Sequence, residues 1–158
     1  MTARSPQTII SSSVNPANLL ELKVLSNIVS QLRDQGDMGQ AIPYLSKMVQ
    51  IVDSQRLEKP TDPQNKTAYY SQLNELQKLK ADAYSQLAFA YLKTHQFVQC
   101  ESWLTSSIKL WEKLIRYDPQ GQPSLMVAYE ALIECYMAMG KDHLAQHIQT
   151  RLCKLKET

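Results

Sequence analysis

Apolar residues recur at intervals of three and four along most of the chain, and almost no run alternates strictly between apolar and polar residues. One such stripe runs from Leu25 to Leu32, and another runs from Leu73 to Leu87. Because an α-helix returns to the same face after three or four residues, this spacing predicts an all-α fold. Turn-forming residues then divide the chain into separate helices. About six helices are predicted, over residues 17–35, 38–54, 65–94, 97–117, 123–139 and 142–156.

Three short turns have similar surroundings when they are aligned on Gly36, His95 and Gly140. Each turn is preceded by four apolar or aromatic residues with the same spacing and is followed, five positions later, by a small residue. The small residues are Ala41, Cys100 and Ala145. A small side chain lets the second helix of each pair approach the first closely. The sequence therefore predicts three helical hairpins.

This arrangement resembles the tetratricopeptide repeat. In that family an aromatic residue, a Leu-small pair, a Tyr and a turn Gly follow one another, and a small residue stands five positions after the Gly. The resemblance implies a right-handed α-solenoid of three antiparallel hairpins, and a non-enzymatic adaptor or scaffold role in protein binding. The sequence departs from the family pattern at His95 in the second turn, and at Asp142 and Gln149 in the third hairpin. These polar residues suit a terminal cap, whose outer face is expected to be polar.

The three segments are also longer than the usual repeat of roughly 34 residues. The equivalent residues Leu25, Tyr84 and Tyr129 lie 59 and then 45 positions apart. Repeats of the kinesin-light-chain type are likewise long and commonly carry a proline two residues after the small alanine, as Ala41-Ile42-Pro43 does here. A proline so near a helix start removes few backbone hydrogen bonds, so it is compatible with the second predicted helix.

Composition and charge indicate the broad class of protein. The formal net charge is only +2 and the charges are evenly mixed, which disfavours nucleic acid as a partner. No apolar run is long enough to span a membrane, and three widely spaced cysteines indicate a reducing compartment such as the cytoplasm. Residues 1–16 are predicted to be a flexible arm, for which a mitochondrial address is left open, and residues 17–158 to be the repeat domain.

A catalytic, metal or cofactor site is not predicted. His143 and His147 share a helix face, but Leu144 stands where the zinc-protease helix needs a glutamate. Glu130 and Glu134 form a pair that could divide acid and base roles, or could be a solvated or peptide-facing surface. No glycine pattern suits a phosphate-binding loop. The protein is therefore expected to be no enzyme and to hold no cofactor.

The first helices of stacked hairpins line the concave side of a solenoid, where an extended peptide or a partner helix binds. Counting from the expected core positions gives a polar groove with mixed charge. Its candidate residues are Lys23, Asn27, Ser30, Arg33, Asp82, Gln86, Phe89, Lys93, Glu130, Glu134 and Met137. Asn27 and Gln86 are expected to bond a peptide backbone, and Phe89 to supply an apolar anchor.

The repeats that clamp the acidic C-termini of heat-shock chaperones carry lysine, asparagine and arginine at defined places. In this chain the equivalent positions hold Ser26, Ser30, Gln86, Val127 and Ala131. Without the cations of those repeats, a chaperone carboxylate clamp is disfavoured.

A second hypothesis starts from the long third helix, whose residues Tyr69 to Leu76 form an apolar stripe beyond its hairpin. On that hypothesis the protein is a structural subunit of a larger assembly and binds through this helix and its convex surface. Self-association is also left open, although a cover from within the chain is favoured.

Overall fold

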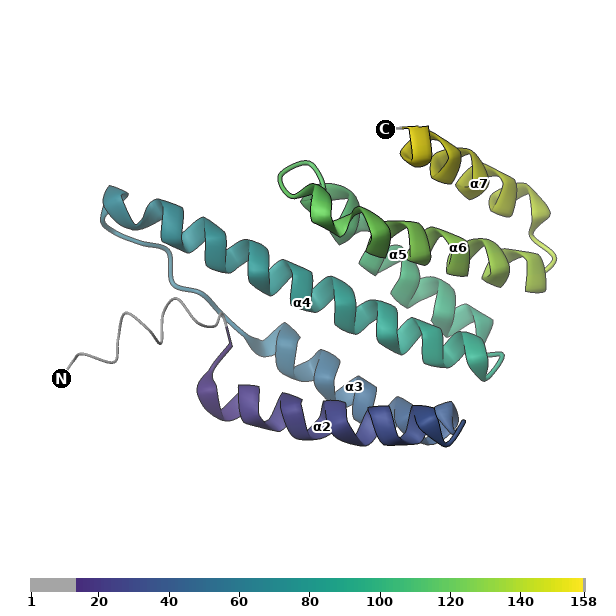
Figure 1. Cartoon of the computed structure of the whole chain (residues 1–158), viewed down its shortest axis with the longest axis horizontal. Coiled ribbons are helices and arrows are strands. Elements are labelled where there is room, and N and C mark those ends of the chain that lie inside the picture. The colour runs from purple at the N-terminus through teal and green to yellow at the C-terminus, as the bar shows by residue number, and fades with distance from the viewer. Residues whose placement is uncertain (1–13, 158) are drawn as a thin grey trace.

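The computed structural model describes residues 14–157. Between these residues the chain forms six α-helices, two short 3₁₀-helices and no strand, so the predicted all-α class is confirmed. The helices are α2 (Pro16–Asp34), α3 (Met38–Ser54), α4 (Lys66–Lys93), α5 (Phe97–Leu114), α6 (Gln122–Ala138) and α7 (Asp142–Glu157). The 3₁₀-helices are η1 (Pro63–Asn65) and η2 (Pro119–Gly121). The helices follow one another across the molecule in chain order (Figure 1).

Predicted and observed helix ends differ most in α5, which ends at Leu114 rather than at residue 117. The difference arises because the chain turns there: the N–H groups of Tyr117 and Asp118 both donate to the Leu114 carbonyl. Residues 1–13 of the predicted arm lie outside the described part of the chain. Just after them, Val14 is buried, and the Asn15 N–H donates to Gln55 Oε1 at 3.0 Å.

Short polar side chains begin several of the helices. Asn15 caps α2 by accepting from the Ala17 N–H at 2.9 Å, and Asp37 caps α3 by accepting from the Gln40 N–H at 3.2 Å. The sequence Asp-Pro-Gln occurs twice, at residues 62–64 and 118–120. In both copies the aspartate caps a 3₁₀ turn that leads directly into the next α-helix, α4 or α6. These caps help to fix where α2, α3 and the two 3₁₀ turns start.

The three aligned turns have the same backbone geometry. Gly36 and Gly140 both have φ of 74°, and His95 has φ of 60°, which is the left-handed region. In each turn the following residue closes the helix with the same bond, which joins Asp37 N to Leu32 O, Gln96 N to Tyr91 O and Lys141 N to Tyr136 O, each at 2.8 Å. The three helix pairs therefore reverse direction in the same way.

Each helix packs against the next one along the chain, and α4 also contacts α6. The predicted small residues lie where paired helices meet, since Ala41 and Cys100 are fully buried and Ala145 is 3% exposed. Two core clusters result: one joins α2, α3 and α4, and the other extends from α4 to α7. Helix α4 contributes side chains to both clusters and so links the two halves of the molecule.

The apolar stripe predicted on the extended part of α4 is partly covered by the rest of the chain. Leu76 is only 3% exposed, whereas Tyr70 is 57% exposed. Tyr69 and Leu73 are half-buried, and the rings of Tyr69 and Tyr70 meet edge to face at 5.3 Å.

Candidate functional site

The candidate site is a recessed surface along α4. It lies on the face of α4 that is directed toward α2 and α6. Three hollows adjoin there, and Gln86 lines all three of them. Asp82 and Phe89 each line two. The shared residues make the hollows one continuous surface, which we call the groove.

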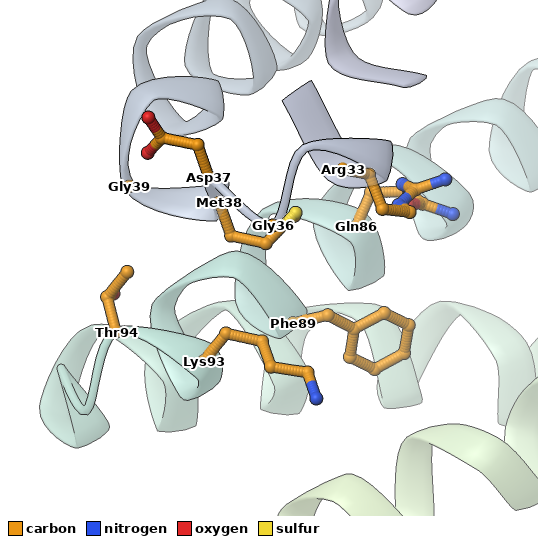
Figure 2. A pocket seen from close by; sticks show the side chains of 9 residues that line it. All are labelled: Arg33, Gly36, Asp37, Met38, Gly39, Gln86, Phe89, Lys93 and Thr94. Atoms are coloured by element: carbon orange, nitrogen blue, oxygen red, sulfur yellow. The ribbon is translucent and has the colours of Figure 1, made fainter. Parts of the chain in front are cut away.

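The largest hollow, of about 730 Å³, lies between the α2–α3 turn and the C-terminal end of α4 and is called the turn hollow (Figure 2). Arg33 from α2 and Gln86 from α4 meet across it, with the Arg33 guanidinium donating to Gln86 Oε1 at 2.7 Å. Phe89 and Lys93 lie further along α4 on the same hollow. The hydrogen bond between Arg33 and Gln86 holds the long arginine side chain in place at the edge of the turn hollow.

The second hollow, called the α2 hollow, has a volume of about 270 Å³ and lies between α2, α3 and α4. Its lining is mostly apolar and includes Leu19, Leu22, Met48 and Val52. Lys23 and Asp82 add one charge of each sign. The α2 hollow can therefore take an apolar side chain beneath a polar rim.

The third hollow, also of about 270 Å³, lies between α4 and α6 and is called the α6 hollow. Phe89 lines it from α4, Val127 from α6 and Trp111 from α5. Trp111 is 5% exposed, and its indole nitrogen has no hydrogen-bond partner among the residues that the structure describes. A buried donor of this kind is stabilised when an acceptor reaches it.

Three polar side chains lie close together in the groove. Gln86 accepts a hydrogen bond from Arg33, and both residues act on the carboxyl of Asp82. Burial raises the pKa of the Asp82 carboxyl above its ordinary value, while the Gln86 amide and the charge of Arg33 oppose that rise. Asp82 is exposed, but it lines two hollows, and the protein atoms around it there displace part of the water that would solvate its charge.

Six of the predicted groove residues line the three hollows. They are Lys23, Arg33, Asp82, Gln86, Phe89 and Lys93. The other predicted residues are exposed on α2 and α6 but line none of these hollows. They are Asn27, Ser30, Glu130, Glu134 and Met137.

Several lining residues were not predicted from the sequence. Met38 is the first residue of α3 and Thr94 directly follows α4, so neither lies on the face of a first helix that the repeat pattern assigns to the groove. Val127 occupies the same offset in the third segment as Lys23 and Asp82 do in the first two. The shared position relative to the turn is a signal in the sequence from which Val127 could have been predicted as a groove residue.

The side chains considered for chemistry lie apart from the groove. His143 and His147 are exposed on α7. Cys100 and Cys135 are fully buried, and burial raises the pKa of both thiols, which disfavours the reactive thiolate. Across residues 14–157 no three His, Cys, Asp or Glu side chains are grouped so that they could hold a metal ion.

Comparison with known proteins gives no match to a protein-family model, to a curated protein or to a solved structure. Among the described helices, none combines the length and the apolar character needed to cross a membrane.

Proposed function

We propose that the protein is a non-enzymatic interaction module whose groove binds an extended peptide or a helix of a partner protein. The observation that carries this proposal is the single face of α4 from which Gln86 reaches all three hollows. An acid, an amide, an aromatic ring and a base follow one another along this face, at Asp82, Gln86, Phe89 and Lys93. Such a surface can hydrogen-bond a peptide backbone and hold alternate side chains.

The proposal includes a right-handed solenoid of three hairpins of the tetratricopeptide type. Its support is the shared turn geometry at Gly36, His95 and Gly140, together with the small buried residues five positions later. In such an array the first helices face the concave side, which is where α2, α4 and α6 supply the groove.

We place the module in the cytoplasm as part of the same proposal. The support is chemical: Cys100, Cys135 and Cys153 are all free thiols, and Cys153 is exposed. Exposed free thiols persist in a reducing compartment.

Peptide selection tests the proposed function. The full chain would be screened against a library of random-sequence peptides, and bound peptides would be measured against a variant that combines Gln86→Ala with Phe89→Ala. We expect that variant to lose about 2 kcal/mol of binding free energy, because it removes both the shared amide and the aromatic anchor.

The control variant combines Asn27→Ala with Ser30→Ala, two exposed residues of α2 that line none of the hollows. It should bind the selected peptides as the wild type does. A screen that yields no peptide sensitive to Gln86 and Phe89 would reject the groove as the binding surface.

A structural subunit of a larger assembly is the second candidate function, favoured by the exposure of Tyr70, at 57%, on the extended part of α4. If this surface binds a second copy, the wild type will show a mass above that of one chain in solution, and Tyr70→Ser will restore the monomer mass. A wild type that is already monomeric at high concentration would exclude self-association through this surface.

A further inference from the structure

The turn hollow contains two cations without a salt bridge. Arg33 and Lys93 line it and are exposed, and neither takes part in a salt bridge within residues 14–157. The acid in its lining is Asp37, whose carboxylate caps α3 by accepting from the Gln40 N–H. Figure 2 shows that this carboxylate points away from Arg33, Phe89 and Lys93. The hollow therefore presents positive charge to whatever enters it.

The hydrogen bond to Gln86 prepares Arg33 for a ligand. Gln86 occupies only part of the guanidinium, which has five N–H donors in a planar fork, so donors remain for a second acceptor. The bond to Gln86 holds the guanidinium at the hollow. A side chain that is held in place before binding loses less entropy when the ligand arrives.

From this geometry we infer that the turn hollow takes the side-chain carboxylate of an acidic segment in the partner, held by the Arg33 guanidinium and the Lys93 ammonium. The inference rests on the proposed function and names its ligand chemistry. A carboxylate matches the arginine fork in shape and both residues in charge. The Phe89 ring beside it lowers access of water and so strengthens the pairing.

Asp82 opposes this binding. Its carboxyl attracts Arg33 and lies on the neighbouring hollows, so a ligand carboxylate meets a negative charge nearby. Removal of that charge should raise the affinity for acidic peptides and lower any affinity for basic ones. The sign of the change therefore identifies the charge of the ligand.

The test uses the full chain and a library of random-sequence peptides with amidated C-termini, so that only side chains supply carboxylates. Selected peptides should be rich in Asp and Glu, and replacement of those residues by Asn or Gln should weaken binding about tenfold. Arg33→Gln and Lys93→Gln should each weaken the same peptides about tenfold, with a smaller loss at high salt. The matched control Lys109→Gln, an exposed lysine on α5 away from the hollows, should leave affinity within about twofold.

The acid variants complete the test. Asp82→Asn should strengthen the acidic peptides several-fold, whereas Glu75→Gln, an exposed acid on the same helix, should not. Selection of neutral or basic peptides, or weaker binding of the acidic peptides by Asp82→Asn, would overturn the inference. If such peptides still depend on Gln86 and Phe89, the proposed function stands and only the ligand chemistry is wrong. If no peptide depends on these residues, both proposals fail.

Discussion

The α2–α3 pair and the α4–α5 pair share a turn geometry but differ in how they are buried. Helix α2 has one buried side chain, Val29, and leaves Leu20 and Val24 66% and 51% exposed. Helix α4 buries seven side chains and joins both core clusters. One pair lies at an end of the array and the other has neighbours on both sides (Figure 1). The same local pattern is therefore expected to contribute different amounts of stability at the two places.

Their turns differ in a related way. The α2–α3 turn places Gly36 in the left-handed region, whereas the α4–α5 turn places His95 there. A residue with a side chain is strained in this conformation and persists only where the surroundings impose it. The extensive packing on both sides of α4 supplies that constraint. The inner pair can carry a strained turn that the end pair avoids.

The largest expected difference between the two pairs is in their leucines. Leu87 of α4 is fully buried, so Leu87→Ala should lower the free energy of unfolding by about 2–5 kcal/mol through lost contacts and a new cavity. Leu20→Ala in α2 removes an exposed side chain and should change the free energy of unfolding by no more than about 0.5 kcal/mol. Chemical denaturation of both variants measures the difference. Similar losses at the two sites would show that α2 is covered in solution by something beyond residues 14–157.

A buried hydroxyl pair also distinguishes the inner helix pair. Ser107 Oγ donates to the Ala81 carbonyl at 2.7 Å and lies 2.5 Å from Ser85 Oγ, so that α5 is hydrogen-bonded to α4 inside the core. Ser107→Ala leaves the Ala81 carbonyl and the Ser85 hydroxyl without this partner. It should destabilise the protein by about 1–3 kcal/mol.

Two variants test that explanation by denaturation. Ser106→Ala, its exposed neighbour on α5, should leave stability unchanged within error. The double change of Ser85→Ala with Ser107→Ala should recover part of the loss, because the buried hydroxyl of Ser85 is then absent as well. An equal loss at Ser106 would show that the effect does not come from the buried bond, because alanine is the better helix former at either position.

The helices could be predicted from the sequence because two local signals coincide. Apolar spacing gives the length of each helix, while residues such as Asn15, Asp37 and Gly140 mark where helices start or end. The end of α5 was placed too late because Ile115 continues the apolar spacing, although the chain already turns at Leu114. Backbone hydrogen bonding decides that position, and residue spacing does not report it.

The candidate site was less predictable than the fold. Offsets from the core place Gln86 and Phe89 on the same face of α4, since a helix fixes which residues share a face. They cannot show how far apart neighbouring helices stand, and this separation decides which residues line a hollow. Asn27 therefore lies outside the three hollows while Met38, at the start of α3, lines one of them.

The smallest expected effect is at the α4–α5 turn. His95→Gly removes the strain of a side chain at φ of 60° but also loses the edge contact of the imidazole with Phe97, at 5.7 Å between ring centres. Because strain in this region is worth about 1–2 kcal/mol and such an exposed ring contact less, the variant should gain about 0.5–1 kcal/mol. At the end pair the opposite holds: Gly36→Ala has open space around it but φ of 74°, so it should lose about 1 kcal/mol. Thermal unfolding of the two variants measures both signs. If His95→Gly were destabilising, the ring contact would outweigh the strain, and the inner pair would keep its histidine because of packing rather than despite its backbone.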